Sequence, residues 1–261
     1  MKQLHTDQED GLATLVASEV IEHVSLNTRT FPPQMSDQHE PDYIQEVVTD
    51  ERSFWIRLAN TETGRNSANA LISKMYSWRG YAGGGQLSSD PNKITLTASS
   101  QDRIVGTVTL NIDSPVGLLA DDAFKDEIDQ YRAQGEKLCE LSKLAVDPDV
   151  RSKWILASLF HIAFIYGRRF HDRSRVFIEV NPRHQRFYQR MLGFSMHCPV
   201  KMNRRVNAPA CLLSLSLDYV EQQIAQFGGR IHTADVERSL YPYFFSPQEE
   251  VGITGRLQKL D

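Results

Sequence analysis

The pattern of apolar and polar positions divides the chain into three parts. Near the start, apolar residues recur at helical spacing, and a polar stretch with three prolines follows up to residue 50. We interpret residues 1–50 as an N-terminal helical arm and polar linker. Residues 51–227 carry strong periodic patterns and predict one folded domain. The patterning is weak over 228–261, so this part is described only as a C-terminal tail of uncertain structure.

Within the folded domain, period-two and helical patterns predict an ordered series of elements. In chain order these are a strand at 54–59, a helix through 68–75, strands at 93–99 and 104–112, a helix begun by Asp121 or Asp122, a strand at 138–146, a helix at 152–170, a strand at 175–180, a helix ending at Gly193 and a strand at 211–217. Antiparallel strands followed by strand, helix, strand, helix, strand predict a mixed α/β domain. The helix at 152–170 is apolar on nearly every side and must be buried.

The helix that follows the strand at 175–180 has well-marked ends. Asn181 suits an N-cap, Pro182 suits the first helical position, and Gly193 suits the C-terminal end. Four residues between them share one face at the i, i+3, i+4, i+7 spacing: His184, Phe187, Tyr188 and Met191. A tyrosine hydroxyl is therefore carried toward the interior.

The charge of the chain is unevenly distributed. The formal net charge is −4, but residues 151–205 hold twelve Lys or Arg against Asp172 and Glu179, which gives +10 for this region. A basic field of this size attracts an acidic partner, although it is also compatible with a solvated basic face. The chain has no recognisable nucleic-acid motif and is acidic as a whole, so nucleic acid is not predicted as the partner.

Several function classes are not supported by the sequence. Cys139, Cys198 and Cys211 form no CxxC pair, so neither a disulfide framework nor a metal site is predicted. No segment reaches the roughly 18 consecutive apolar residues that span a bilayer, and no signal peptide is recognisable. We therefore expect a cytoplasmic protein without stable membrane insertion. Walker loops, GxGxxG fingerprints, HExxH and hydrolytic triads are not found either.

Glu140 lies in an otherwise apolar strand pattern and needs a physical reason to be there. Under strict alternation it shares a side with Leu138, Leu144 and Val146. An unpaired carboxylate at such a place costs several kcal/mol or has a raised pKa. Glu140 is therefore either one partner of a structural ion pair or a general base for an amine, and Glu179 on the next strand competes for the second role.

Tyr188 is equally ambiguous from the residues alone. A tyrosine on an inner helix face is more often a packing residue with a hydrogen-bonded tip than a proton donor. His184 is the alternative acid on the same face, although a lone histidine in such a position is usually structural.

Three sequence runs carry a resemblance to a known superfamily: GTVTL at 106–110, CELSKLAVDP at 139–148 and EVNPRHQRFYQRMLGF at 179–194. Together they resemble the GNAT superfamily of N-acyltransferases and, more narrowly, the long-chain N-acyl amino acid synthases. The similarity covers about residues 53–220 and includes RLA at 57–59, YSWRGY at 76–81 and VNAPACLL at 206–213. ELSKLAV also resembles the ExSRxxV strand of acyl-homoserine-lactone synthases, but Lys143 replaces the arginine, which weakens that interpretation.

The resemblance implies a fold and a set of roles. The fold is a mixed, mainly antiparallel sheet with a splayed central parallel strand pair and helices on both faces. The strand at 138–146 would part from the strand at 175–180, and the pantetheine arm of an acyl thioester would enter the opening. By position, Glu140 is the implied general base and Tyr188 the implied acid. A backbone N–H near Ser142, Lys143 and Leu144 would polarise the thioester carbonyl.

The acyl donor is inferred from a departure from the superfamily pattern. Members that use acyl-coenzyme A usually carry a glycine-rich segment whose N–H groups wrap the pyrophosphate. This chain has VRSKWIL there instead, with Arg151 and Lys153 at a helix N-terminus, where a single phosphate can be held. The missing glycines and the basic region favour acyl carrier protein over coenzyme A. No bound cofactor is expected, only the acyl-phosphopantetheine thioester as donor substrate.

The leading hypothesis is therefore an N-acyltransferase that moves a long-chain fatty acyl group from acyl carrier protein to the α-amine of an amino acid. Trp78 and Arg79 in YSWRGY are candidates for the acceptor site, because Arg79 can pair with a substrate carboxylate; a packed aromatic turn explains the cluster equally well. Two alternatives remain open. One is an acyl-homoserine-lactone-type synthase, and the other is a non-catalytic module that binds acyl carrier protein.

Overall fold

The computed structural model describes residues 45–49, 52–78, 80–81, 86–87, 89–100, 103–150 and 152–258. The predicted helical stripe of the N-terminal arm, the glycine run 83–85, Arg79 and Arg151 lie outside the described residues. The strands are β1 Gln45–Thr49, β2 Arg52–Leu58, β3 Lys93–Ser100, β4 Arg103–Ile112, β5 Leu138–Val146, β6 Arg175–Val180, β7 Ser195–Met196, β8 Lys201–Asn203 and β9 Ala208–Ser216. The helices are α2 Glu62–Trp78, α3 Asp121–Ala133, α4 Lys153–Phe164, α5 Gln185–Leu192, α6 Leu217–Phe227 and α7 Pro247–Leu257.

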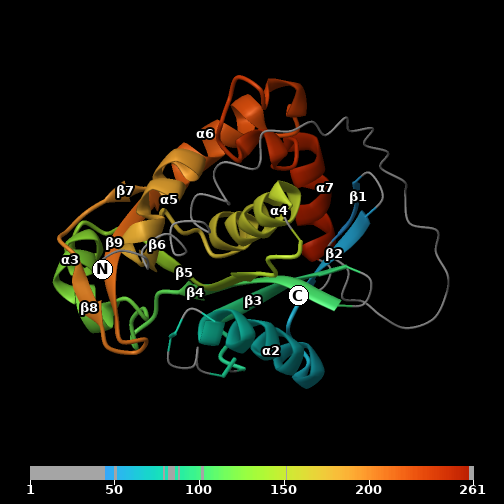
Figure 1. The fold of residues 1–261 in the computed structure, drawn as a ribbon. Helices are drawn as coiled ribbons and strands as arrows, with labels where there is room; N and C mark the ends of the chain where they lie inside the picture. Colours follow the sequence, from blue (N-terminus) through green and yellow to red (C-terminus); the bar gives the residue numbers. More distant parts are fainter. Residues whose placement is uncertain are drawn as a thin grey trace, which may run out of the picture.

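The strands form one mixed sheet in the order β1-β2-β3-β4-β5-β6-β9-β7, and β8 pairs with β9. Neighbouring strands are antiparallel except for β5 and β6 at the centre, which run parallel. Helices cover both faces, with α4 and α7 on one side and α2 on the other (Figure 1). The structure confirms the predicted fold class, a mixed α/β architecture with a central parallel strand pair.

Most of the predicted elements are found close to their expected places. The face of α2 that is buried consists of Ala68, Leu71, Ile72 and Met75, as the helical spacing predicts. The long apolar helix is present and buried, but it changes from α-helix to π-helix at Ile165 and continues so to Phe170 (η1). The helix after β6 starts with a 3₁₀ turn, Pro182–His184 (η2), capped by the Asn181 side chain, and Gly193 ends it at φ 84°.

Gln45–Thr49, within the range of the predicted linker, pairs antiparallel with β2 as an edge strand. One local prediction is wrong. Neither Asp121 nor Asp122 is the N-cap of α3, because Ala120 occupies that position without a side-chain cap. Asp121 instead accepts a hydrogen bond from the Leu118 N–H at 2.7 Å and binds the Arg132 guanidinium, also at 2.7 Å.

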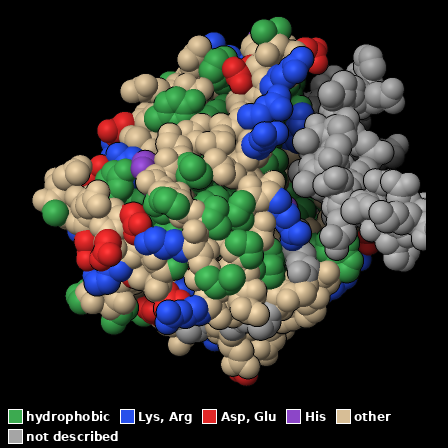
Figure 2. All heavy atoms as spheres, turned by 60° about the vertical axis from the view of Figure 1, so that its left-hand side comes forward, with side chains coloured by type: hydrophobic (Ala, Val, Ile, Leu, Met, Phe, Trp, Pro, Cys, Tyr) green, Lys and Arg blue, Asp and Glu red, His purple; other side chains and the backbone are tan. Residues whose placement is uncertain are grey.

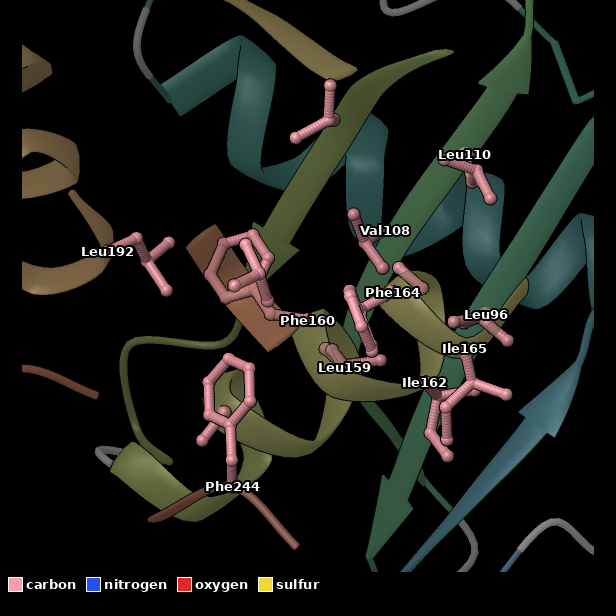
Figure 3. Packing of buried hydrophobic residues seen from close by; sticks show 14 of the residues in the cluster. Leu96, Val108, Leu110, Leu159, Phe160, Ile162, Phe164, Ile165, Leu192 and Phe244 are labelled. Atoms are coloured by element: carbon pink, nitrogen blue, oxygen red, sulfur yellow. The ribbon is translucent and has the colours of Figure 1, made fainter. Parts of the chain in front are cut away.

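The largest part of the core lies between the sheet and α4. Leu96, Val108 and Leu110 project from β3 and β4 toward Leu159 and Ile162 of the helix (Figure 3). A second, smaller cluster lies on the opposite face, where Phe124 and Ile128 of α3 pack on Leu138 and Phe177. A third cluster packs α2 on Ala145. The sheet is therefore buried on both faces, and a polar side chain on its central strands is removed from water.

The C-terminal residues 228–258, which the sequence pattern leaves as a tail of uncertain structure, are packed into the main core. They contain two 3₁₀ turns, Ile231–Thr233 (η3) and Tyr241–Tyr243 (η4), and helix α7, which begins with a capping box at Ser246 and Glu249. Leu240, Tyr241 and Phe244 are buried within the main cluster. Their apolar residues stand in one short run, 240–245, that contains Pro242 and repeats at neither the helical nor the strand period, so no amphipathic stripe marks them in the sequence.

Candidate active site

The central parallel strands part halfway along their length. β5 and β6 pair from Leu138 with Arg175 up to Leu141 with Ile178, and beyond this point β5 pairs only with β4 while β6 pairs only with β9. An opening therefore begins next to Leu141, at the carboxyl ends of two parallel strands.

A β-bulge interrupts β5 at the opening. Thr109 pairs with Ser142 and Thr107 with Ala145, so Lys143 and Leu144 together lie opposite one residue of β4. Lys143 has φ 51°, and its carbonyl accepts a hydrogen bond of 2.8 Å from the Thr107 hydroxyl. A bulge leaves the extra residue outside the regular ladder, so backbone groups here can serve a ligand.

The bulge overturns one prediction about this strand. Leu144 packs against the main cluster together with Leu141, whereas Leu138 belongs to the cluster on the opposite face. Strict alternation put Leu144 on the side of Glu140, and the extra residue reverses the alternation after Ser142.

Glu140 is fully buried, with 1% of its surface exposed, and extends from β5 on the face that carries Leu138 and α3. Its Oε2 accepts hydrogen bonds from the N–H groups of Leu119 at 2.7 Å and Ala120 at 3.4 Å. Burial raises the pKa of Glu140 to about 8; the Leu119 N–H opposes the rise and the nearby Glu179 carboxylate adds to it. Glu140 can therefore take up and release a proton near neutral pH.

Glu179 lies on the same face of the neighbouring strand and forms an ion pair with Arg205. The distance from Glu179 Oε2 to Arg205 Nη2 is 2.5 Å, and Arg205 also donates to the Leu119 carbonyl. Arg205 therefore connects the Glu179 carboxylate to the loop that holds Glu140. Burial raises the pKa of Glu179, although Arg205 and the Asn203 side chain oppose this. Among the described residues, Glu179 Oε1 is buried and has no hydrogen-bond partner.

Asn111 supplies a second buried acceptor atom without a partner in the described part of the chain. It lies opposite Glu140 in the β4–β5 ladder, and its Nδ2 donates to Ser142 Oγ at 2.8 Å and to the Glu140 carbonyl at 3.3 Å. A carbonyl can only accept, so Nδ2 is fixed toward β5 and Oδ1 turns away. Asn111 Oδ1 is buried and unpaired. Buried polar atoms are normally hydrogen-bonded, and such exceptions call for an explanation.

Tyr188 lies on the other face of the sheet. Its ring packs against the main cluster and contacts the rings of Phe187 at 5.3 Å and Phe194 at 5.9 Å. Phe187 and Met191 pack on the same cluster, which confirms the predicted inner face of the helix. His184 lies in the preceding 3₁₀ turn, where its Nε2 accepts from the Arg183 guanidinium at 3.2 Å. Glu140 and Tyr188 thus lie on opposite faces of the sheet.

The predicted donor-binding residues fall into two groups. Ser142, Lys143 and Leu144 form the bulge, where the Lys143 ammonium donates to the Gln86 carbonyl at 3.2 Å. Lys153 is the first residue of α4, and its ammonium lies 3.5 Å from the Tyr243 hydroxyl and over the Tyr243 ring. Burial lowers the pKa of Lys153. Arg151, the second predicted phosphate ligand, lies outside the described residues.

Of the predicted acceptor pair, only Trp78 is described. It is the last residue of α2, and 59% of its surface is exposed. No described contact brings it to Glu140 or Tyr188. Its role as an acceptor-binding residue therefore stays a prediction.

Carboxylates from elsewhere in the chain neutralise much of the basic 151–205 region. Arg169 pairs with Glu221 at 2.7 Å and Glu250 at 2.9 Å, and Arg175 pairs with Glu136 at 2.9 Å. On the face drawn in Figure 2, basic and acidic side chains stand next to one another at the lower left. The arginines of α5 and its entry turn, Arg183, Arg186 and Arg190, are exposed and project away from the core.

Sequence reasoning missed Asn111, Arg205 and the loop at Leu119. The one signal for Asn111 was the alternation of Thr107, Thr109 and Asn111 with apolar residues, which is also typical of a half-exposed strand. In the structure all three are buried. Arg205 gave no signal, since its contact with Glu179 spans 26 residues of chain.

The parted parallel strands, the bulge and the ionisable group beside them define an acyltransferase of the GNAT type. The chain belongs to the family of N-acyl amino acid synthase FeeM, whose family model matches residues 67–216. Its structure is similar to that of FeeM, an N-acyl amino acid synthase from uncultured soil microbes, with a TM-score of 0.60 and 27% sequence identity over 68% of this chain and 98% of that chain. The protein is therefore an N-acyltransferase.

Weaker structural similarities extend to other N-acyltransferases. An acyl-CoA N-acyltransferase from Pseudomonas aeruginosa matches with a TM-score of 0.44 and 15% identity over 63% of this chain and 99% of that one. An N-acetyltransferase from Staphylococcus aureus Mu50 matches with a TM-score of 0.43 and 13% identity over 63% and 98%. No curated protein matches the chain by sequence. In the described part of the chain, no helix combines the length and apolar character needed to cross a membrane.

Proposed function

We propose that the protein transfers a long-chain fatty acyl group from acyl carrier protein to the α-amine of an amino acid. The observation that carries this proposal is the buried Glu140 with its raised pKa beside the parted strands. An α-ammonium has a pKa of about 8 in peptides and a higher one in a free amino acid, so proton transfer to Glu140 is much closer to balance than transfer to a carboxylate of ordinary pKa. A carboxylate with an unperturbed pKa would be a much weaker base for this amine.

The unpaired acceptor atoms support an amine as the acceptor. A substrate ammonium brings three donors and no acceptor. Asn111 Oδ1 and Glu179 Oε1 are buried acceptors without a described partner, and they lie on the face of the sheet that carries Glu140. We infer that these atoms and the Glu140 carboxylate receive the ammonium before Glu140 removes a proton from it.

In the proposed reaction, the base acts from one face of the sheet and the acid from the other. The neutral amine attacks the thioester carbonyl in the opening, where a backbone N–H of the Ser142–Leu144 bulge polarises the carbonyl oxygen. The C–S bond breaks as the amide forms, and Tyr188 protonates the departing thiolate from the opposite face. The second proton of the acylated nitrogen leaves to solvent, from which Tyr188 regains its own. Amine and thiol therefore meet the carbonyl from different sides, which agrees with the separate locations of Glu140 and Tyr188.

Acyl carrier protein as donor rests on the segment before α4. This segment lacks glycine, and Lys153 stands at the helix N-terminus, where the helix dipole and one cation can hold a single phosphodiester. The acyl chain would extend past Leu141 into the apolar space between sheet and α4.

The test is to incubate the full-length protein with palmitoyl acyl carrier protein and all twenty amino acids and to analyse the products by mass spectrometry. One amide mass identifies acyl length and amine together, and the Glu140→Gln variant is the negative control. The same experiment with palmitoyl-coenzyme A identifies the donor, and S-adenosylmethionine as acceptor tests for a lactone. Binding of acyl carrier protein without release of thiol for any acceptor would contradict the proposal and indicate a non-catalytic module.

A further inference from the structure

A small apolar cavity lies between the sheet and α4, and Leu141, beside the point where β5 and β6 part, lines it. Its volume is about 30 Å³, whereas one water molecule needs roughly 10–15 Å³ on the same measure. The cavity is surrounded by apolar side chains and one glycine. The lining residues on the side of the opening include Leu141, the last residue of β5 that pairs with β6, and Phe194, whose ring contacts Tyr188.

Tyr241 and Phe244 form one wall of the cavity, and they belong to a part of the chain that the family match does not include. The matched region ends at residue 216, whereas Tyr241 and Phe244 line the cavity from the C-terminal segment. They are almost completely buried, with 1% and 2% of their surface exposed, and their rings lie 5.0 Å apart. Figure 3 shows Phe244 on the same side of the sheet as Phe160 of α4.

Hydrogen bonds hold this wall in place from two directions. On one side, the Tyr241 hydroxyl donates to the Leu192 carbonyl at 2.7 Å, and the Leu240 N–H donates to the Met191 carbonyl at 2.9 Å. Both acceptors belong to α5, the helix that carries Tyr188. The wall is thus fixed to the helix of the implied acid.

On the other side the wall is fixed to α4. The Phe245 N–H donates to His161 Nδ1 at 3.0 Å, so the proton of the neutral His161 ring lies on Nε2, which is 3.1 Å from Glu250. The Phe244 ring stacks on His161 with centroids 5.1 Å apart. Glu250 also accepts from Arg169 at 2.9 Å. Because these groups are buried and paired, moving the wall would leave polar groups without partners.

We propose that Tyr241 and Phe244 set the length of the acyl chain that the enzyme transfers. This inference rests on the proposed function. A chain that enters past Leu141 and Tyr188 runs toward Tyr241 and Phe244, and the fixed wall stops it. The C-terminal segment therefore acts as a specificity determinant that is separate from the catalytic groups.

Three variants test the wall without touching the implied acid or base. Phe244→Leu moves the wall back. Gly167→Ala fills the cavity, because a Cβ there would lie 3.7 Å from Cys139 Sγ and 3.8 Å from Leu110, which is ordinary contact. Phe245→Leu is the matched control, since Phe245 is also buried against His161 but does not line the cavity.

The measurement is a competition among acyl carrier proteins loaded with chains of twelve to eighteen carbons, with products quantified by mass spectrometry. Relative to the preferred product of the wild type, Phe244→Leu should raise the amide two carbons longer by roughly tenfold, from the free energy of burying two methylenes. Gly167→Ala should favour shorter chains, and Phe245→Leu should leave the distribution unchanged. Unaltered distributions in both Phe244→Leu and Gly167→Ala would overturn the proposal.

A second measurement separates failure of this inference from failure of the proposed function. If neither the wild type nor any variant forms an amide, the proposed function is wrong. The inference about Tyr241 and Phe244 is then tested by the increase in melting temperature that free fatty acids of eight to eighteen carbons produce. The length that stabilises most should increase in Phe244→Leu and decrease in Gly167→Ala. The same optimum in all variants would refute the wall. If Phe244→Leu does not fold, Gly167→Ala alone still tests the inference in both measurements.

Discussion

Replacing Glu140 with glutamine removes a buried ionisable group that makes the stability of the folded state depend on pH. The pKa of Glu140 is about 8 in the folded protein against 4.5 for an ordinary glutamate. The folded state therefore keeps a proton that the unfolded state loses. The contribution of Glu140 to the unfolding free energy is fully present below pH 4.5 and is lost as the pH rises from 4.5 to about 8. The full difference corresponds to about 5 kcal/mol, of which about 2 kcal/mol is lost between pH 6 and pH 8.

The assay is chemical denaturation of the wild type and Glu140→Gln at pH 6, 7 and 8. Other titrating groups are shared and cancel in the difference. A glutamine oxygen can still accept the Leu119 N–H that Glu140 Oε2 accepts at 2.7 Å. The unfolding free energy of the variant should therefore rise by about 2 kcal/mol relative to the wild type from pH 6 to pH 8. Parallel stability curves would refute the reasoning, because they would mean that Glu140 is ionised at pH 6 despite its burial.

The same group should govern the kinetics. We expect kcat/KM of the wild type to rise with pH toward a plateau above an apparent pKa of about 8, and Glu140→Gln to be slower by 10² to about 10⁴. Glu179→Gln should move the profile to lower pH, because the Glu179 carboxylate contributes to the raised pKa of Glu140. Glu127→Gln, which removes a carboxylate paired with Lys201, is the control. A profile unmoved by Glu179→Gln would mean that the two carboxylates are not coupled.

Three further outcomes follow from the structure. Tyr188→Phe should lower kcat by a factor of about 10² without changing the melting temperature. Tyr219→Phe, at a partly exposed tyrosine, is the control and should leave kcat unchanged. If Tyr188→Phe had the same kcat as the wild type, Tyr188 would not be the acid. Lys153→Glu should weaken binding of acyl carrier protein and its dependence on salt, measured by titration at two ionic strengths; unchanged binding would move the docking surface elsewhere. Gly193→Ala should lower the unfolding free energy by about 1–3 kcal/mol, measured by urea denaturation. The loss should exceed that of Gly135→Ala, because both glycines have positive φ but only a Cβ on Gly193 would lie 2.6 Å from the Tyr219 ring. Equal losses in the two variants would contradict this reasoning.

Much of the fold could be predicted from local sequence. The helix around Tyr188 has its cap, its proline, its inner face and its terminal glycine within a few residues of one another, so local rules were sufficient. The same holds for the buried face of α2. The bulge in β5 was not predictable, since no residue in LSKLAV demands it and its position depends on the pairing with β4. That one residue decides which side of the sheet Leu144 faces.

The candidate site shows the same division. Glu140 was recognisable because a carboxylate in an apolar strand is physically expensive, whatever surrounds it. Its surroundings were not, because they come from three other segments of the chain. The Leu119 N–H binds the carboxylate, Asn111 binds the Glu140 backbone carbonyl, and Arg205 binds the Leu119 carbonyl. The predicted acceptor residue Trp78 was inferred from a local cluster alone, and the structure gives it an exposed position at the end of α2.

The sequence by itself determined the order of the elements, the capped helix and the presence of a carboxylate where apolar residues belong, because these depend on neighbours along the chain. Only the tertiary structure decided where the parallel strands part, which buried atoms lack partners and which residues close the cavity. The last point is the clearest case. Tyr241 and Phe244 lie more than ninety residues from Leu141 in the chain, yet they line the same apolar cavity. Contacts of this kind arise from the packing of segments that no local pattern connects.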